Sequence, residues 1–175
     1  MSKSIQLILR AAAFAADKHR NQRRKDYART PYINHPLAVA RVLSEEGGVT
    51  DPEILAAAIL HDTLEDTETT PRELTREFGT RIASLVAEVT DDKTLPKQRR
   101  KQLQVEHAPK KSKGAALIKT ADKICNLRDI KMSPPKSWSV ERRSNYIKWA
   151  NDVVTALPIG QHPLRRVFKE AMVGA

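Results

Sequence analysis

The stretch that decides the fold runs from residue 51 to residue 66 and reads DPEILAAAILHDTLED. Residues 54–60 form an unbroken apolar run, which has too little alternation for a half-exposed strand. Asp51-Pro52-Glu53 supplies an N-cap, a proline at the first helical position and an early acid, so the run is predicted to be a buried helix. His61-Asp62-Thr63-Leu64-Glu65-Asp66 ends it, with four polar side chains in one continuous arc at about 100° per residue.

An imidazole and carboxylates at the end of a buried helix indicate a metal site, because buried carboxylates are costly unless positive charge compensates them. His61 and Asp62 offer a mixed nitrogen and oxygen ligand set, which suits a divalent ion such as manganese, iron or zinc. Two adjacent residues cannot complete such a site, so a further His and Asp are expected on other helices. The alternative is a solvated helix end with ordinary charges, which the apolar run disfavours.

Two other segments carry candidates for the missing ligands. Residues 30–36 read TPYINHP, and Pro36 fits the first position of a helix, which puts His35 at the N-cap. A helix is predicted over residues 115–130, with Asp122 and Asn126 one turn apart on a face separate from the apolar one. His35 and Asp122 are the candidate remote ligands, although an isolated histidine is more often a satisfied core residue. Asn126 could hydrogen-bond a base edge or a ribose, or satisfy backbone groups.

Charge and length limit the partners and the domain organisation. The 175 residues include 31 Lys and Arg against 21 Asp and Glu, a formal net charge of +10. This length predicts a single domain, residues 1–175, with a core at about 5–157 and a helical tail at 158–175. The charge indicates an anionic partner, and nucleic acid, an acidic membrane surface and a small polyphosphate are the candidates. Aromatic residues make up only 5% and do not interleave with basic ones as a stacking platform, which disfavours nucleic acid.

The single cysteine, Cys125, excludes an intramolecular disulfide and a cysteine-based zinc cluster, and it fits a reducing compartment. Residues 1–16 are too few to span a bilayer, are interrupted by polar side chains and lack the layout of a signal peptide. We therefore expect an amphipathic first helix in a cytoplasmic protein that has no membrane partner.

Helical periodicity covers most of the remaining chain, interrupted at Gly47-Gly48, at Gly79 and at residues 90–96, 109–114 and 132–138. Three of these segments carry further candidate residues. The loop over residues 20–31, which contains Arg24 and Lys25, could hold phosphate, or it could be a solvated connector. Lys97 begins a very basic helix over residues 97–106. Tyr146, in a helix expected from Ser139 to about residue 157, could belong to the core or form a wall for a nucleotide.

With His35, His61-Asp62 and Asp122 on separate predicted helices, the chain resembles the HD superfamily of metal-dependent phosphohydrolases. The likeness is closer to the single-domain small alarmone hydrolases of the RelA/SpoT family, and it covers roughly residues 5–157. Five motifs in the same order carry it: RRK at 23–25, TPYINHP at 30–36, HDTLEDT at 61–67, VTDDK at 89–93 and ADKICNLRD at 121–129.

The resemblance implies an all-α fold, an HD-domain helical bundle, with one manganese ion, for which another divalent transition ion could substitute. It implies hydrolysis of guanosine 3′-diphosphate 5′-di- or triphosphate to pyrophosphate plus GDP or GTP. By position, the metal ligands match His35, His61, Asp62 and Asp122, the acidic pair at the reaction centre matches Glu65 and Asp66, and the nucleotide contacts match Arg24, Lys25, Asn126 and Tyr146. The basic helix that begins at Lys97 is expected to help neutralise the substrate phosphates.

Two alternatives stay open. The same metal site could act on another nucleotide, such as the 2′-phosphate of NADPH or a deoxynucleoside triphosphate. A less favoured alternative is a basic nucleic-acid-binding module whose acidic cluster only stabilises the fold; it predicts binding that depends steeply on salt.

Overall fold

The computed structural model describes residues 2–173, and every regular element in that part of the chain is helical, as predicted. An isolated β-bridge joins Arg23 and Pro31. In chain order the elements are α1 (Lys3–Lys18), α2 (Asn34–Arg41), the π-helical turn η1 (Val42–Glu46), α3 (Pro52–Leu60), α4 (Thr63–Asp66), α5 (Pro71–Phe78), α6 (Thr80–Val89), α7 (Lys97–His107), the 3-10 turn η2 (Ala108–Lys110), α8 (Lys113–Met132), α9 (Val140–Ala156) and α10 (Leu164–Met172).

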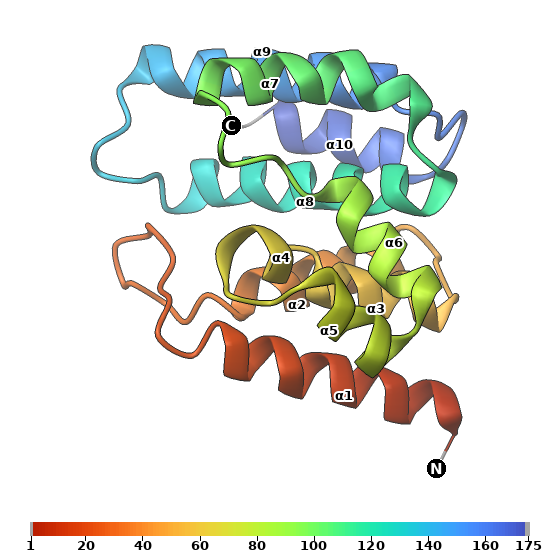
Figure 1. The fold of residues 1–175 in the computed structure, drawn as a ribbon. Coiled ribbons are helices and arrows are strands. Elements are labelled where there is room, and N and C mark those ends of the chain that lie inside the picture. The colour runs from red at the N-terminus through yellow and green to blue at the C-terminus, as the bar shows by residue number, and fades with distance from the viewer. Residues whose placement is uncertain (1, 174–175) are drawn as a thin grey trace.

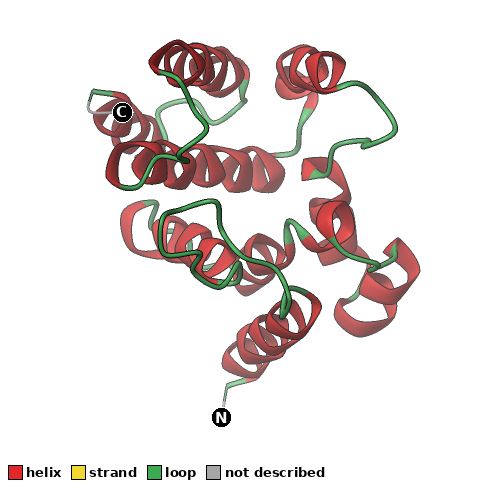
Figure 2. Ribbon diagram, turned by 90° about the vertical axis from the view of Figure 1, so that its left-hand side faces the viewer, coloured by secondary structure: helices red, strands yellow, loops and turns green. Residues whose placement is uncertain are grey.

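Helix α8 lies at the centre of the structure. Figures 1 and 2 show it between two groups of helices, with α7, α9 and α10 on one side and α2, α3 and α1 on the other. Every residue from 115 to 125 is buried, so α8 is covered all round rather than along one stripe. The charged residues in that span, Lys119, Asp122 and Lys123, are therefore inside the protein.

The apolar run of α3 is buried, as its sequence predicts. Ala56, Ala57, Ala58 and Leu60 have no exposed surface, and α3 packs against α1, α2, α6 and α8. The fully buried residues of α1 are alanines, and such small side chains let two helices approach closely. The end of α3 is thereby fixed from several sides, which matters because His61 and Asp62 follow it directly.

Helix ends follow the expected capping chemistry. The side-chain oxygens of Asp51, Thr70 and Ser139 accept backbone N–H groups at the starts of α3, α5 and α9. Gly79 separates α5 from α6 with a φ of 87°, a conformation that a residue with a Cβ rarely adopts. The caps at Asp51 and Ser139 confirm the predicted starts of α3 and α9.

Two local predictions are wrong. His61 and Asp62 do not continue α3 but form a turn before α4, because Thr63 Oγ1 donates to the Leu60 carbonyl oxygen at 2.7 Å and competes with the helical pattern. His35 is not an N-cap, because α2 begins at Asn34 and so places His35 within its first turn.

The C-terminal segment packs against the rest of the protein. Leu164, Val167 and Phe168 of α10 are buried, and α10 contacts α8 and η1. A Cβ at Gly47 would lie 3.2 Å from the Leu164 side chain, so glycine allows this close approach. Among residues 2–173, no helix has both the length and the apolar character needed to cross a membrane.

Candidate metal centre and adjacent cavity

The turn between α3 and α4 holds the His61 imidazole in one orientation. Its Nδ1 donates to the Ala58 carbonyl oxygen at 2.8 Å, so the neutral ring carries its proton on Nδ1 and its lone pair on Nε2. Nε2 is buried, has no hydrogen-bond partner in the described part of the chain and lies 3.1 Å from Asp62 Oδ2. A buried lone pair without a donor is what a metal ligand presents in the absence of the ion.

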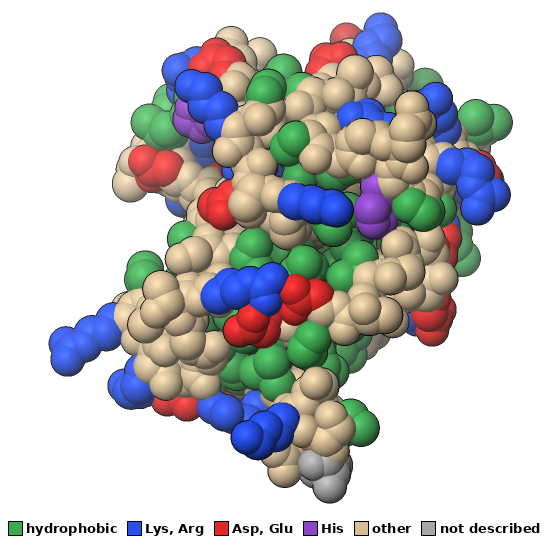
Figure 3. All heavy atoms as spheres, turned by 90° about the vertical axis from the view of Figure 1, so that its right-hand side faces the viewer, with side chains coloured by type: hydrophobic (Ala, Val, Ile, Leu, Met, Phe, Trp, Pro, Cys, Tyr) green, Lys and Arg blue, Asp and Glu red, His purple; other side chains and the backbone are tan. Residues whose placement is uncertain are grey.

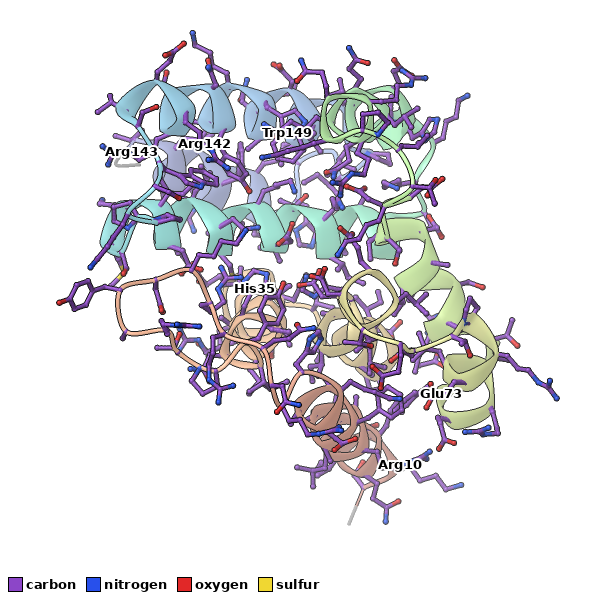
Figure 4. All side chains as sticks on the ribbon, turned by 60° about the vertical axis from the view of Figure 1, so that its left-hand side comes forward. Arg10, His35, Glu73, Arg142, Arg143 and Trp149 are labelled. Carbon is purple, nitrogen blue, oxygen red and sulfur yellow. The ribbon has the colours of Figure 1, made fainter. Side chains whose placement is uncertain are left out.

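His35 and Asp122 join this pair from two other helices. His35 Nε2 lies 3.2 Å from Asp122 Oδ1 and 4.0 Å from Asp62 Oδ2, and His61 Nε2 lies 3.9 Å from Asp122 Oδ1. Figure 4 shows His35 on α2, in the space below α8. Two imidazoles and two carboxylates that converge at these separations fit the nitrogen and oxygen ligands of one divalent transition ion.

Charge in the cluster is balanced among its members. Burial opposes the ionisation of Asp62 and Asp122, yet the neighbouring imidazoles, and Lys123 beside Asp122, hold the pKa of both carboxyls well below its usual range. Burial likewise disfavours a charged His61, but Asp62 and Asp122 outweigh it and raise the pKa of His61 to about 9. A bound cation would displace that proton from Nε2, because a histidine ligand must be deprotonated there. The two buried carboxylates therefore require a positive group, and a divalent ion would supply it.

Glu65 and Asp66 lie beside the cluster but are held by other groups. Glu65 Oε2 accepts the Asp91 backbone N–H at 3.1 Å, and burial raises the pKa of Glu65. The Asp66 carboxylate binds the Lys93 ammonium through one oxygen and lies 3.3 Å from the Tyr32 hydroxyl through the other. Both acids thus face the candidate metal centre while other partners fix their orientation.

Tyr32 is a site residue that the sequence reasoning missed. Its hydroxyl donates to Asp62 Oδ2 at 2.7 Å, and its ring lies 4.8 Å from the His19 ring, centroid to centroid. Burial, together with Asp62, raises the pKa of Tyr32, so it stays a neutral donor. The available signal was its place three residues before His35 at the start of a helix.

Two buried lysines of α8 were missed as well. Lys123 Nζ donates to Asp122 Oδ2 at 3.0 Å, and Lys119 Nζ donates to the Val89 carbonyl oxygen at 2.9 Å. The signal was a pair of lysines four residues apart in an otherwise apolar stretch, on either side of Asp122. A surface helix would carry such lysines toward solvent, whereas α8 is buried all round.

A cavity of about 470 Å³ lies next to the metal centre. This volume lies within the usual range of small-molecule sites. Four residues line both this cavity and the smaller pocket around the candidate ligands, so the two spaces adjoin each other: Arg24, Tyr32, Asp66 and Asn126.

The predicted substrate-binding residues divide into two groups. Arg24, Lys25, Asn126 and Tyr146 all line the cavity. Lys97 does not line it; it borders a neighbouring hollow of about 510 Å³ together with Lys101 and Arg142. Burial and the nearby charges of Arg142, Lys25 and Arg100 lower the pKa of Lys97, so Lys97 belongs to a cluster of mutually repelling cations.

Asn126 connects the cavity to the metal centre. Its Nδ2 donates to Asp122 Oδ1 at 2.6 Å, and its Oδ1 accepts from Arg24 Nη2 at 3.4 Å. Arg24 also pairs with Asp129 one turn along α8. Asn126 thus links a cationic side chain of the cavity to the candidate ligand Asp122.

Aromatic rings close the other side of the cavity. The Tyr146 ring lies 5.6 Å from the Trp138 ring and 5.3 Å from the Trp149 ring, and burial raises the pKa of Tyr146 to about 12. Its hydroxyl is therefore neutral and able to donate. Cys125 is buried without lining the cavity, and burial raises the pKa of its thiol to about 12.

Comparisons with known proteins agree with this arrangement. The family model described as "HD domain" matches residues 11–150. A protein of Xenopus tropicalis named guanosine-3′,5′-bis(diphosphate) 3′-pyrophosphohydrolase MESH1 is 58% identical over 157 residues, which cover 90% of this chain and 88% of that protein. The protein of the same name from Homo sapiens is 54% identical over 162 residues, with 93% and 90% covered.

A solved structure is also similar. Its title reads "A metazoan ortholog of SpoT hydrolyzes ppGpp and plays a role in starvation responses"; it superimposes with a TM-score of 0.92 at 44% identity, with 99% of this chain and 96% of that chain covered. The chain therefore belongs to the HD-domain family, and within it to the group of MESH1 pyrophosphohydrolases.

Proposed function

We propose that this protein hydrolyses guanosine 3′,5′-bis(diphosphate) and its 5′-triphosphate form, releasing the 3′-pyrophosphate and leaving GDP or GTP. The observation that carries the proposal is the convergence of His35, His61, Asp62 and Asp122 beside a 470 Å³ cavity with a cationic rim. The names of the similar proteins point to the same reaction. We further propose that the domain, residues 1–175, acts in the cytoplasm.

These four residues would hold one manganese ion. Two imidazole nitrogens and two carboxylate oxygens suit manganese, and other divalent transition ions accept the same donors. When bound, such an ion polarises a phosphoryl oxygen and makes water more acidic. The protein fixes the His61 donor through its Nδ1 hydrogen bond to Ala58 and fixes Asp62 through the Tyr32 hydroxyl.

Glu65 and Asp66 are proposed to act on the attacking water. Glu65 lies within the polar pocket with its carboxylate fixed by the Asp91 N–H, so it would accept the proton as water attacks the phosphorus bonded to the ribose 3′ oxygen. Asp66, held by Lys93, would orient that water. The phosphorus–oxygen bond to the ribose then breaks, the ribose 3′ oxygen leaves and takes up the proton that Glu65 accepted or one from solvent, and pyrophosphate and GDP or GTP are released.

The cavity is proposed to hold the nucleoside and its 5′-phosphates. Arg24 and Lys25 would pair with phosphoryl oxygens, Asn126 would hydrogen-bond the ribose or base, and the Tyr146 ring would pack against the base. Lys97 and its basic neighbours would add long-range attraction from the adjacent hollow, and this attraction should weaken with salt.

A continuous basic surface for nucleic acid is absent from the face opposite the cavity loops. Figure 3 shows Lys and Arg side chains there interspersed with Asp, Glu and hydrophobic ones. Binding to nucleic acid requires basic residues clustered on a face or along a helix. The basic side chains that do cluster, Lys97, Lys101 and Arg142, border the hollow beside the cavity, where a small polyphosphate substrate would meet them.

The test is a nucleotide panel assayed with manganese, before and after chelation. We expect pyrophosphate release from the guanosine bisphosphate to exceed phosphate release from NADPH and turnover of deoxynucleoside triphosphates, and we expect chelation to stop it. His61→Ala should abolish turnover, and His107→Ala, a change at an exposed histidine, should not. Preferred turnover of NADPH, or salt-dependent RNA binding that survives His61→Ala without nucleotide turnover, would overturn the proposal.

A further inference from the structure

Lys119 is a buried charge to which the proposed chemistry assigns no role. Its side chain is buried among the helices that pack around α8, and only 7% of the residue is exposed. The ammonium donates to the Val89 carbonyl oxygen at 2.9 Å, whereas a lysine has three donors. Burial lowers the pKa of Lys119, and the nearby Lys123 lowers it further. Burying a charged ammonium costs free energy, so a role for Lys119 beyond packing is expected.

The surroundings of Lys119 are those of the reaction centre. It lines the same pocket as His61, Asp62 and Glu65, a space of about 180 Å³. The negative charges that stabilise its ammonium belong to Asp91, Asp122 and Glu65. The side chain thus faces the proposed catalytic groups rather than the apolar core.

Within residues 2–173, the Lys119 side chain makes one hydrogen bond, and its partner belongs to the segment that holds Glu65. Val89 is the last residue of α6, and Asp91, two residues later, donates its backbone N–H to Glu65 Oε2 at 3.1 Å. Lys119 therefore joins α8, which carries Asp122, to the end of α6, which orients Glu65. Gln104 Nε2 of α7 supports the same segment through Asp91 Oδ2, at 2.5 Å.

We propose that Lys119 is a positioning residue for Glu65. Its bond to Val89 holds the Asp91 N–H against the Glu65 carboxylate. Its ammonium adds to the positive charge of Arg100, whose Nη1 lies 3.8 Å from Glu65 Oε1. The inference rests on the proposed function, since it concerns the group that would accept the proton of the attacking water.

A purely structural lysine would behave differently on substitution. Lys119→Met keeps the length of the side chain but removes the charge and the bond to Val89. If Lys119 only stabilised the fold, activity would fall in proportion to the loss of folded protein, and a hydrophobic replacement of a buried charge is often neutral or stabilising. If it positions Glu65, turnover falls although the protein stays folded and keeps its metal.

The test compares four variants with the wild type: Lys119→Met, Lys119→Arg, Glu65→Gln and the double variant Lys119→Met with Glu65→Gln. Thr120→Val is the matched control, because it removes a buried α8 hydrogen bond, to the Ala116 carbonyl oxygen, outside the site. Manganese content, thermal midpoint, kcat and KM are measured for each. Lys119→Gln, which keeps a donor, replaces Lys119→Met if that variant does not fold.

We expect Lys119→Met to lower kcat by about 10- to 100-fold, with manganese content and KM within about twofold of wild type. Lys119→Arg should recover part of the loss. In the Glu65→Gln background the same change should cost less than threefold, because the lysine acts through that carboxylate. Equal losses in both backgrounds, a kcat within about twofold of wild type, or a loss confined to metal content or KM would overturn the proposal.

The wild-type result separates the two proposals. A wild-type enzyme that prefers another nucleotide refutes the proposed substrate, and the Lys119 variants are then compared on the nucleotide that it does turn over. If the wild type turns over no nucleotide of the panel, both proposals fall together; if it turns over the guanosine bisphosphate while Lys119→Met matches it, only the positioning proposal falls.

Discussion

The candidate metal centre and the neighbouring cavity differ in how the fold fixes them. The four candidate ligands come from α2, α8 and the turn after α3, and three of them, His35, His61 and Asp122, are at most 8% exposed. The cavity residues come largely from the loops before α2 and after α8, and Lys25 among them is exposed. Core packing thus positions the proposed chemistry, and residues on exposed loops are expected to select the substrate.

This difference predicts two kinds of variant. Changes in the metal centre should affect metal content and kcat, because they remove groups that touch the reacting atoms. Changes in the cavity should affect KM, because they remove groups that bind substrate and transition state alike.

The largest effect is expected from Asp122→Ala. The change removes one proposed ligand and leaves the His35 and Lys123 nitrogens without their carboxylate partner. Manganese should be lost on dialysis, and turnover should fall below detection. Metal analysis of the purified variant tests this, and an Asp122→Ala protein that holds one equivalent of manganese would remove this residue from the ligand set.

Glu65→Ala should separate metal binding from turnover. Glu65 is held by the Asp91 N–H rather than by the histidines, so the ion should stay bound while kcat falls by about 10²- to 10⁴-fold, the usual contribution of a general base. Metal content and kcat are measured on the same sample. Loss of the ion would instead place Glu65 among the ligands.

A pH profile extends the same prediction. Because burial raises the pKa of Glu65, its basic form is lost as the pH falls, starting above the range of an ordinary glutamate. Turnover by the wild type should therefore decline on the acid side within that higher range. The residual turnover of Glu65→Gln should lack this acid limb, and an unchanged limb would assign it to another group.

Tyr32→Phe should give an intermediate loss, about 10- to 100-fold in metal affinity or turnover. The change removes only the hydroxyl that donates to Asp62 and leaves the ring packing against His19 in place. Tyr27→Phe is the matched control, because Tyr27 is 77% exposed. Equal behaviour of the two variants would show that the Asp62 contact has no role.

More of the metal centre than of the cavity could be predicted from the sequence. His61-Asp62 follows an apolar run and Asp122 lies within one, and burial of an ionisable residue is visible in such patterns. The break in the helix at His61 was not predictable in this way, because it depends on the Thr63 hydroxyl bonding the Leu60 carbonyl instead of solvent. Helical periodicity does not encode that choice.

Tyr32 and Lys119 were missed for a different reason. Their partners, Asp62 and the Val89 carbonyl, lie about thirty positions away along the chain, so the contacts exist only once the helices pack. Lys97 shows the converse case. The basic helix that carries it is evident in the sequence, but the position of Lys97 beside the cavity rather than in it depends on how α7 packs on α9.

Arg24→Ala tests the cavity side of the comparison. A hydrogen bond to a charged group contributes about 1.5–3 kcal/mol, so KM should rise about tenfold or more while kcat changes little. The dependence of kcat/KM on salt should also weaken. Arg72→Ala, at an exposed arginine of α5, is the control. An unchanged KM would remove the loop that carries Arg24 from the proposed substrate site.

The smallest effect is expected outside both regions, at the ion pair between Glu46 and Arg128. Arg128 donates to the two Glu46 oxygens at 2.6 and 2.8 Å, and this hydrogen bonding lowers the pKa of Glu46. Because the pKa of Glu46 is lower in the folded protein than in the unfolded chain, the pair stabilises the folded state at pH values above the ordinary pKa of glutamate. This stabilisation is lost as the pH falls through the pKa that Glu46 has in the folded protein. Both side chains are more than a third exposed, so solvent screening limits the contribution to about 0–1 kcal/mol.

Glu46→Gln should therefore lower the free energy of unfolding slightly at pH 7 and not at pH 3, as measured by urea denaturation at both values. Because the pair joins η1 to α8 without touching the metal centre or the cavity, kcat and KM should stay at wild-type values. A change in either constant would mean that the Glu46–Arg128 pair affects the position of Asp122 through α8. The metal centre and the cavity loops would then not account for activity by themselves, because this distant ion pair would contribute as well.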